Sequence, residues 1–506
     1  MTQEPDLSIG GRTRTLLKNA IEAYRHDPEA VPILIRHLDR LDGPLRVALA
    51  GRVKAGKSTL LNALVGEQIA PTDSGECTKV VTWYRAATER RITVHSVTGR
   101  AIGLPVITRQ GGLVIELNQL PLAEIDRVTV DWPAAGLRAA TLIDTPGTSS
   151  TTGHTSARSV TLLSTDEKPS DADAVVYLMR HLHTSDLRLL ESFHTNTRHG
   201  TMQTTPGGNA VSPINSIAVL SRADEIGAGR IDALQSAKRI ARRYRDDREL
   251  SRLCQTVVPV AGLLAQTGRT LRAGEFATLL DLTRANRHRV EASLLSVDRF
   301  TSTAPTADER QTRADLLSRF GLYGIRLALT LIRQGYDDLP RLAGELVRRS
   351  GLEELQQVLA TQFTERAELL KSRSALLAVN QVLRTRPNDR SAALLSDLER
   401  IYSGAHEFAE LRLLSALRSG ALILPQELNS EALRLLGWSG RDSWARLALE
   451  PYADAPLVRR AALATLDRWR RTAENPMSRR AEVQAAQVII RSCEGMLAEL
   501  PTQRSR

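Results

Sequence analysis

Residues 51–58 follow the pattern G-x-x-x-x-G-K-[ST], and no other feature of the sequence constrains the fold as strongly. The apolar run 45–50 before the pattern predicts a strand, and the run 59–65 after it predicts a helix. A strand, a glycine-rich loop and a helix in this order form a phosphate-binding loop. The sequence therefore predicts an α/β domain that binds a nucleoside phosphate.

The residue types of this loop suit an anion. Gly51 and Gly56 let the backbone wrap closely around phosphate groups, with N–H groups pointing inward. We expect Lys57 to neutralise the outer phosphates and the Ser58 hydroxyl to bind Mg²⁺. The nucleotide-binding residues expected here are Gly51, Arg52, Val53, Lys54, Ala55, Gly56, Lys57, Ser58 and Thr59.

Length and composition indicate a folded chain of two or three domains, with 506 residues, 42% hydrophobic and 25% charged. No run reaches the roughly 18 apolar residues that cross a bilayer, and residues 1–11 contain no secretory signal, so we expect a cytoplasmic protein. Cys77, Cys254 and Cys493 are isolated and fit no metal-ligand spacing.

The net charge of +11 comes mostly from arginines spread over the whole chain. It indicates either a generally Arg-rich surface or one that attracts anionic membrane lipid, and both interpretations stay open. Nucleic acid is not an expected partner, because no recognition module accompanies the charge.

A second motif supplies an acid. The apolar run 139–143 predicts a strand that delivers Asp144 at its carboxyl end, where nucleotide sites form in doubly wound sheets. We expect Asp144 to hold Mg²⁺ through water. Gly147, in the order Asp-Thr-Pro-Gly, is placed to meet the γ-phosphate with its N–H and to act as a switch hinge.

A third motif favours guanine. The predicted strand 214–220 ends in Ser221-Arg222-Ala223-Asp224, where Asp224 can accept two hydrogen bonds from the guanine ring N–H and amine, a donor pair that adenine lacks. Arg222 can stack its planar guanidinium on the base. A further strand, 256–260, ends in Ala261 and Gly262, which are expected to back the base.

The candidate for the first switch is Thr78, whose hydroxyl can bind Mg²⁺ and whose carbonyl can bind the attacking water. Thr72 and Thr82 are alternatives for this role. Further strands are predicted at residues 91–95, 112–117, 127–130 and 173–179. The predicted fold class is a P-loop α/β domain with a doubly wound, mostly parallel sheet.

The motif set resembles the dynamin superfamily, and in particular bacterial dynamin-like proteins such as the isoniazid-inducible proteins of mycobacteria. The resemblance rests on residues 50–64, 69–73, 144–150, 221–227, 319–326 and 349–353. It implies a GTPase head, a neck and a trunk. It further implies peripheral action on anionic lipid at the inner face of the plasma membrane, in membrane remodelling or in envelope-stress and drug tolerance. The implied partners are a second copy bound through the heads or a sister dynamin-like protein.

The chain departs from dynamins of the eukaryotic type, which have Gln and Ser in the loop where this chain has Val53 and Lys54. Lys54 either supplies a fixed charge in place of a monovalent cation or faces solvent. Thr148 follows the Asp-Thr-Pro-Gly motif where a Gln could position water, so we expect slow basal hydrolysis. The expected catalytic residues are Lys57, Thr78, Gly147 and Lys54.

Strand signals vanish after about residue 285, and helical periodicity continues to the end of the chain. Helices are predicted at 286–300, 308–334, 339–383, 391–401, 406–418, 427–436, 443–449, 456–472 and 478–500. We predict neck helices at 1–43, a GTPase domain at 44–284 and a helical neck and trunk at 285–506, with a hinge near 301–307. The helical stretch 13–41 is expected to pack with helices that follow the GTPase domain.

The apolar run Leu422, Ile423 and Leu424 lies at a Gly/Pro-bounded break, and either inserts shallowly into a membrane or belongs to a core. Two other functions remain open. One is a GTP-regulated interaction protein without membrane activity, and the other is an RNA- or ribosome-associated GTPase, for which no RNA module is visible.

Overall fold

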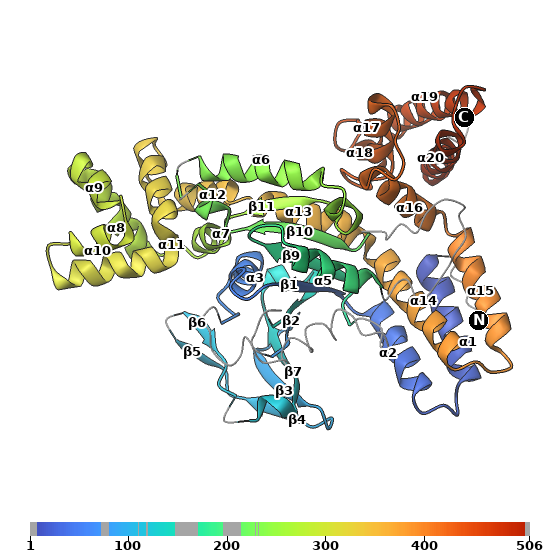
Figure 1. Ribbon diagram of the computed structural model, residues 1–506, viewed down its shortest axis with the longest axis horizontal. Helices are drawn as coiled ribbons and strands as arrows, with labels where there is room; N and C mark the ends of the chain where they lie inside the picture. Colours follow the sequence, from blue (N-terminus) through green and yellow to red (C-terminus); the bar gives the residue numbers. More distant parts are fainter. Residues whose placement is uncertain are drawn as a thin grey trace.

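The computed structural model of the chain describes residues 8–71, 80–109, 111–117, 120–146, 171–195, 214–227, 229–230 and 232–500 (Figure 1). Within these residues, no helix is long and apolar enough to cross a membrane.

A nine-stranded sheet forms the centre of the nucleotide-binding domain, with the strand order β11-β10-β9-β1-β8-β2-β7-β3-β4. Its strands are β1 Leu45–Gly51, β2 Thr82–Ala86, β3 Arg91–Ser96, β4 Ala101–Leu104, β7 Ile125–Trp132, β8 Ala140–Asp144, β9 Ala174–Met179, β10 Ser216–Ser221 and β11 Val257–Val260. The hairpin of β5 Ile107–Arg109 and β6 Gly112–Val114 forms a separate small sheet.

The strands from β11 to β8 are all parallel. They consist mainly of Val, Ile, Leu and Ala and are buried almost throughout, as expected for parallel strands covered by helices on both faces. In this register the carboxyl ends of β1, β8, β10 and β11 meet at one edge of the sheet. The predicted mostly parallel fold class is confirmed.

The remaining strands extend the sheet with mixed directions. β2 runs antiparallel to β8 and parallel to β7, and β3 and β4 continue as antiparallel neighbours. The predicted strands 91–95 and 127–130 are found in β3 and β7. The predicted strand 112–117 is shorter than expected, since β6 ends at Val114 and pairs with β5 outside the large sheet.

Helices cover the sheet. Those nearest to it are α3 Lys57–Val65, α5 Thr184–Thr195, α6 Ala233–Arg245, α7 Gly262–Arg269, α12 Leu339–Arg349 and α13 Leu352–Gln362. α7 packs against both α3 and α12, and α6 and α13 both contact β11. Helices from beyond residue 330 are therefore part of the wall of the nucleotide-binding domain.

A four-helix group packs the first two helices of the chain with helices that follow the nucleotide-binding domain (Figure 1). α1 Ile9–Ala23 and α2 Ala30–Asp42 pack with α14 Ala367–Thr385 and α15 Ser391–Gly404. The Tyr24 hydroxyl donates to the Arg386 carbonyl at 2.6 Å, and Lys371 Nζ donates to the Leu41 carbonyl at 2.7 Å. The helices before the sheet thus pack with helices far beyond it, while the exact domain boundaries and the hinge remain predictions.

Two further helical units flank these parts. The helical arm, residues 273–333, contains α8 Ala273–Arg284, α9 Arg287–Ser293, α10 Val297–Ser302 and α11 Ala307–Arg333, and it extends to the left in Figure 1. The C-terminal unit contains α16 His406–Arg418, α17 Gln426–Leu435, α18 Ser443–Arg446, α19 Ala455–Glu474 and α20 Arg480–Glu499, with its own apolar core around Trp469.

Three predicted helices are wrong in their continuity, one of them 308–334, since α11 is broken at Gly321. The expected helix 339–383 is divided into α12, α13 and α14. Gly351, with a left-handed φ of 83°, separates α12 from α13, and the short turn Thr364–Arg366 separates α13 from α14. A side chain at Gly351 would collide with the Pro259 carbonyl, so the glycine permits close packing on β11. The expected helix 286–300 is interrupted after α9, and Ser296 caps the start of α10 by accepting from the Arg299 N–H at 3.2 Å.

Candidate nucleotide-binding site

The loop between β1 and α3 has the backbone shape of an anion cradle. Gly51, Lys54 and Gly56 have positive φ angles of 145°, 61° and 93°. A side chain at Gly51 would collide with the Leu178 carbonyl of the neighbouring strand β9. Glycine is therefore required where the loop leaves the sheet.

Lys57, the first residue of α3, folds its side chain back over this loop. Its Nζ donates to the carbonyls of Gly51 at 3.2 Å and Arg52 at 3.3 Å. Burial lowers the pKa of Lys57, and the nearby Asp144 carboxylate opposes that shift. The ammonium group thus lies within the cradle, where phosphate oxygens would replace carbonyl oxygens as its partners.

Ser58 and Asp144 are in direct contact. The Ser58 hydroxyl donates to Asp144 Oδ2 at 2.8 Å. Asp144 Oδ1 is buried and has no hydrogen-bond partner among the described residues. Burial raises the pKa of Asp144, while Lys57 and the Ser58 hydroxyl act in the opposite direction.

These oxygens fit a hard cation. Mg²⁺ prefers oxygen ligands and keeps several waters, and the unpaired Oδ1 is the kind of acceptor that a metal-bound water satisfies. No cluster of three or more His, Cys, Asp or Glu side chains with metal-ligand geometry occurs in the described part of the chain. A magnesium ion here would therefore share its coordination with phosphate oxygens.

The neighbouring switch residues are only partly described. Thr145 donates its hydroxyl to the Leu49 carbonyl at 2.8 Å, which ties the end of β8 to β1. Thr78, its alternative Thr72, and Gly147 lie outside the described residues. Thr82, the other alternative, lies opposite Asp144 in the β2–β8 pair, but it is buried and its hydroxyl donates to the Val80 carbonyl at 3.4 Å.

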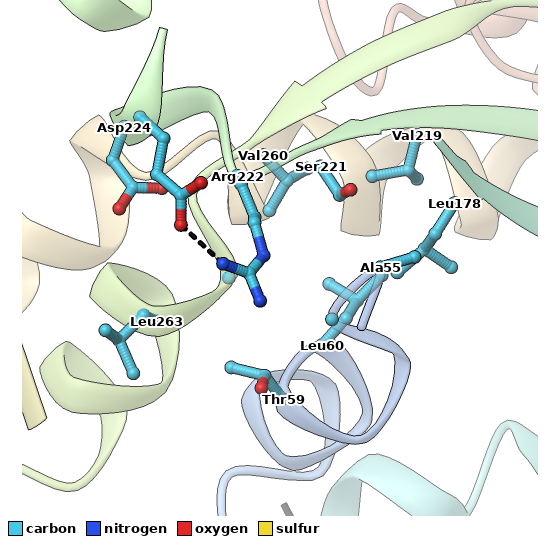
Figure 2. Close-up of a pocket in the computed structure, with 13 residues that line it drawn as sticks. Ala55, Thr59, Leu60, Leu178, Val219, Ser221, Arg222, Asp224, Val260 and Leu263 are labelled. Atoms are coloured by element: carbon cyan, nitrogen blue, oxygen red, sulfur yellow. Dashed lines mark hydrogen bonds and ion pairs between the residues drawn. The ribbon is translucent and has the colours of Figure 1, made fainter. Parts of the chain in front are cut away.

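A pocket beside the loop joins the phosphate loop to the base-reading segment 221–225 and to the end of strand β11 (Figure 2). Its wall comes from the phosphate loop and α3, the ends of β9, β10 and β11, and the start of α7. The lining residues are Ala55, Gly56, Thr59, Leu60, Leu178, Val219, Ser221, Arg222, Asp224, Glu225, Val260, Gly262 and Leu263. The phosphate loop and the expected base-reading residues are therefore continuous.

Most base-reading candidates line this pocket. Ser221 donates its hydroxyl to the Met179 carbonyl at 3.2 Å, and burial raises the pKa of Asp224. Gly262 lines the pocket, but Ala261 does not, and its N–H donates to the Ser350 carbonyl at 2.9 Å. Of the two residues expected to back the base, Gly262 alone is therefore in position.

Two residues were not identified from the sequence. Glu225 Oε1 accepts from Arg222 at 2.6 Å, and its other oxygen pairs with Arg180 at 2.6 Å. Arg222 itself has a left-handed φ of 51°. The three-residue spacing of Arg222 and Glu225 could have indicated their ion pair. Arg180 follows another strand, so no local pattern in the sequence indicates its contact with Glu225. This pair of contacts fixes the guanidinium that was expected to stack on the base.

The loop residues that the phosphate-binding pattern does not specify are on the surface. Arg52, Val53 and Lys54 are all exposed, and Val53 is 45% exposed. Val53 has no polar group that could hold a water. Lys54 is accessible to a ligand or a partner at the rim, so both of its expected roles remain open.

The apolar run 422–424 is divided between core and surface. Leu424 is buried and Leu422 half-buried, and both pack in the core of the C-terminal unit, while Ile423 is 76% exposed. Insertion of all three side chains into a membrane would require this core to open. The structure leaves Ile423 as the accessible member of the expected membrane-contact run.

Comparisons with known proteins show which family this chain resembles. A sequence model described as the dynamin family matches residues 47–102. The isoniazid-induced protein IniC of Mycobacterium tuberculosis is 41% identical over 505 residues, which span 98% of this chain and 100% of that protein. A bacterial dynamin-like protein of Nostoc punctiforme is 37% identical over 79 residues, 16% of this chain and 11% of that protein.

Among solved structures, one described as an oligomerised bacterial dynamin pair for long-range sensing and tethering of membranes is similar over 79% of this chain and 80% of that chain. Its TM-score is 0.30 and its sequence identity 12%, values too low to support an inference.

Proposed function

Because the chain belongs to the bacterial dynamin-like family of IniC, we propose that it binds GTP in this pocket and hydrolyses it to GDP and phosphate. The observation that carries the proposal is the continuity of the site. Lys57 and the Ser58–Asp144 pair lie at one end, and Asp224 lies at the other. A guanine nucleotide could therefore place its phosphates beside Lys57 and its base beside Asp224.

The phosphates would be bound by the loop N–H groups, the positive end of α3 and the Lys57 ammonium. Ser58 and, through water, Asp144 would hold Mg²⁺, with Thr78 as the proposed third ligand. When bound, Mg²⁺ neutralises charge on the β- and γ-phosphate oxygens. Asp224 would select guanine by accepting from its ring N–H and amine, with Arg222 over the base.

Hydrolysis is expected to be slow in the isolated chain. No glutamine stands in the loop or after Gly147 to orient water. Lys54 is proposed to supply a fixed positive charge near the developing negative charge. Thr78 and the Gly147 N–H would close on the γ-phosphate and reopen after its release. Pairing of two GTPase heads, or of a head with that of a sister protein, would complete such a site.

The cellular role is proposed from the family and the surface. IniC is named for induction by isoniazid, and the net charge of +11 suits anionic lipid. We infer peripheral association with the inner face of the plasma membrane and a role in membrane remodelling or envelope-stress tolerance. Ile423 is the side chain of the apolar run that could contact lipid without unfolding the C-terminal core.

The test combines nucleotide and membrane measurements. Wild type and Lys57→Ala are compared for GTP binding and phosphate release, and both are sedimented with anionic or zwitterionic vesicles in the presence of a non-hydrolysable GTP analogue. GTP binding that is lost in Lys57→Ala, with pelleting on anionic vesicles, supports the whole proposal. GTP turnover without pelleting in any nucleotide state would indicate a GTP-regulated interaction protein. Retained tight binding by Lys57→Ala would overturn the site.

A further inference from the structure

The base pocket is backed by a helix that follows Asp224 by about one hundred residues. α11 has a break at Gly321, with φ 62° and ψ 170°, and the part after this break packs against α7 and the short turn Ala223–Glu225. A side chain at Gly321 would lie 3.5 Å from Leu263, which lines the pocket. The helical arm therefore borders the proposed guanine site.

Arg326 joins the base-reading segment to this arm. Its Nη1 donates to the Gly229 carbonyl at 2.9 Å, and its Nη2 donates to the Leu294 carbonyl at the end of α9. The guanidinium is half-buried, and its planar fork reaches both carbonyls. The Arg326 side chain thus links Gly229, close to Asp224, with Leu294 in the helical arm.

Gly229 is packed directly beside Asp224. It has a left-handed φ of 68°, and a Cβ there would lie 3.6 Å from the Asp224 carbonyl oxygen and 4.0 Å from Tyr323 Cβ. Tyr323 is only 5% exposed, and burial together with the Asp224 charge raises the pKa of Tyr323 to about 12. The segment that carries Asp224 is therefore supported on its outer side by α11.

We propose that Arg326 is a positioning residue for base recognition, which holds Gly229 and thereby keeps the Asp224 carboxylate in place to read guanine. The inference rests on the proposed function, since it assumes that the base lies beside Asp224. Asp224 lies in a short turn after β10, outside the ladder of the sheet, so its position depends on such side-chain contacts. Loss of Arg326 would leave the phosphate loop intact, and only the segment that carries Asp224 would become less firmly held.

The test uses the full chain and two nucleotides. Inosine triphosphate lacks the exocyclic amine of GTP, so it forms one fewer hydrogen bond with Asp224. The dissociation constants of both nucleotides are measured for wild type, Arg326→Ala and Arg326→Lys. A charge-assisted hydrogen bond corresponds to a preference for GTP of about 10- to 100-fold in wild type. We expect this preference to fall below about threefold in Arg326→Ala, because GTP loses two hydrogen bonds to Asp224 and inosine triphosphate loses one.

Arg313→Ala is the matched control, because Arg313 also lies on α11 and donates to the Phe300 carbonyl at 3.0 Å, within the arm. It should keep the wild-type preference. Arg326→Lys should recover part of the preference and serves as the test if Arg326→Ala does not fold. Equal weakening of both nucleotides, or an unchanged preference in Arg326→Ala, would overturn the inference while leaving GTP binding established. A wild type that binds neither nucleotide would overturn the proposed function and the inference together.

Discussion

The Ser58 hydroxyl donates a 2.8 Å hydrogen bond to Asp144 across 86 residues of sequence. It occupies Oδ2, and Oδ1 is left buried without a partner among the described residues. A buried, unsatisfied carboxylate oxygen is costly, and a metal-bound water would remove that cost. The relationship therefore indicates that the two side chains are arranged for a cation before nucleotide binds.

Asp144→Asn should raise the Mg²⁺ concentration needed for GTP hydrolysis and lower the maximal rate by about 100-fold. The amide keeps the size of the side chain but removes the charge that holds metal-bound water. Phosphate release is measured over a Mg²⁺ titration. Asp131→Asn on β7, which alters an ion pair with Arg85 on β2, is the control and should follow wild type. An unchanged Mg²⁺ requirement in Asp144→Asn would exclude Asp144 from the metal site.

Asp224→Asn should shift base preference from guanine to xanthine, with an expected change in the ratio of affinities of about 100-fold. Xanthine carries a carbonyl where guanine has its amine, and an amide side chain can donate to that carbonyl. Competition between GTP and xanthosine triphosphate for a fluorescent nucleotide measures the ratio. If the variant still prefers GTP as strongly as wild type, Asp224 does not read the base.

The sequence predicted the parallel strands and the loop because both have local signals: buried apolar runs for β1, β8, β9 and β10, and fixed glycines for the loop. β4 and β5 were missed, since a glycine interrupts the four residues of β4 and β5 has a single apolar residue among its three. The break at Gly351 had a local signal, a glycine just after the basic last turn of α12, but the Pro259 carbonyl that excludes a side chain there belongs to a strand far away in sequence.

The same limit applies to the site. The residues proposed to bind phosphate follow from a motif, but the supports of the base-reading residues come from elsewhere in the chain. Glu225 is fixed by Arg180, which directly follows β9, and Gly229 is fixed by Arg326 from α11. Likewise, an apolar run such as 422–424 has no pattern that separates core from surface, and packing alone shows that Leu424 is buried. Local sequence patterns do not predict contacts between residues that lie far apart in the chain.

Lys54→Ser should lower the rate of GTP hydrolysis by about tenfold and make it dependent on K⁺ or Na⁺. Lys54 is exposed at the rim of the loop, with a φ of 61°, so the substitution leaves the buried cradle intact. Turnover is measured in potassium, sodium and a bulky organic cation. Lys54→Arg keeps the charge and should stay near the wild-type rate. A variant with full activity and no new salt dependence would show that Lys54 is merely solvated.

Asp173→Asn should lower the free energy of unfolding by about 3–5 kcal/mol. Asp173 at the start of β9 pairs with Arg40 of α2 at 2.5 Å, and the side chains are only 1% and 3% exposed. The second carboxylate oxygen accepts from the Arg46 N–H at 3.0 Å, so the change removes a buried charge that faces Arg40. Urea unfolding of wild type and Asp173→Asn at pH 7 measures the change in the free energy of unfolding.

The matched control for this substitution is Arg14→Ala, which removes the pair with Asp42, where the side chains are 35% and 68% exposed. We expect this exposed pair to contribute less than about 1 kcal/mol. Similar losses in both variants would contradict the view that the buried pair joins α2 to the sheet.

His37→Gln should make the chain less sensitive to mild acid. His37 is buried in α2, and burial, with the charges of Arg40, Arg36 and Arg46, holds its pKa well below the ordinary value of 6.5. As pH falls below about 6.5, the unfolded chain binds a proton at this histidine and the folded chain does not. The free energy of unfolding should therefore fall by up to about 1.4 kcal/mol per pH unit in wild type, until the folded pKa is reached.

Urea unfolding of wild type and His37→Gln at pH 7.5, 6.5 and 5.5 separates titration from packing. At pH 7.5 the histidine is neutral in both states, so the difference between the two proteins there reports the altered packing of the side chain. The change in that difference toward pH 5.5 reports proton uptake by the unfolded chain, and it should favour His37→Gln. Parallel stability curves for the two proteins would mean that His37 is not held neutral between α2 and the sheet.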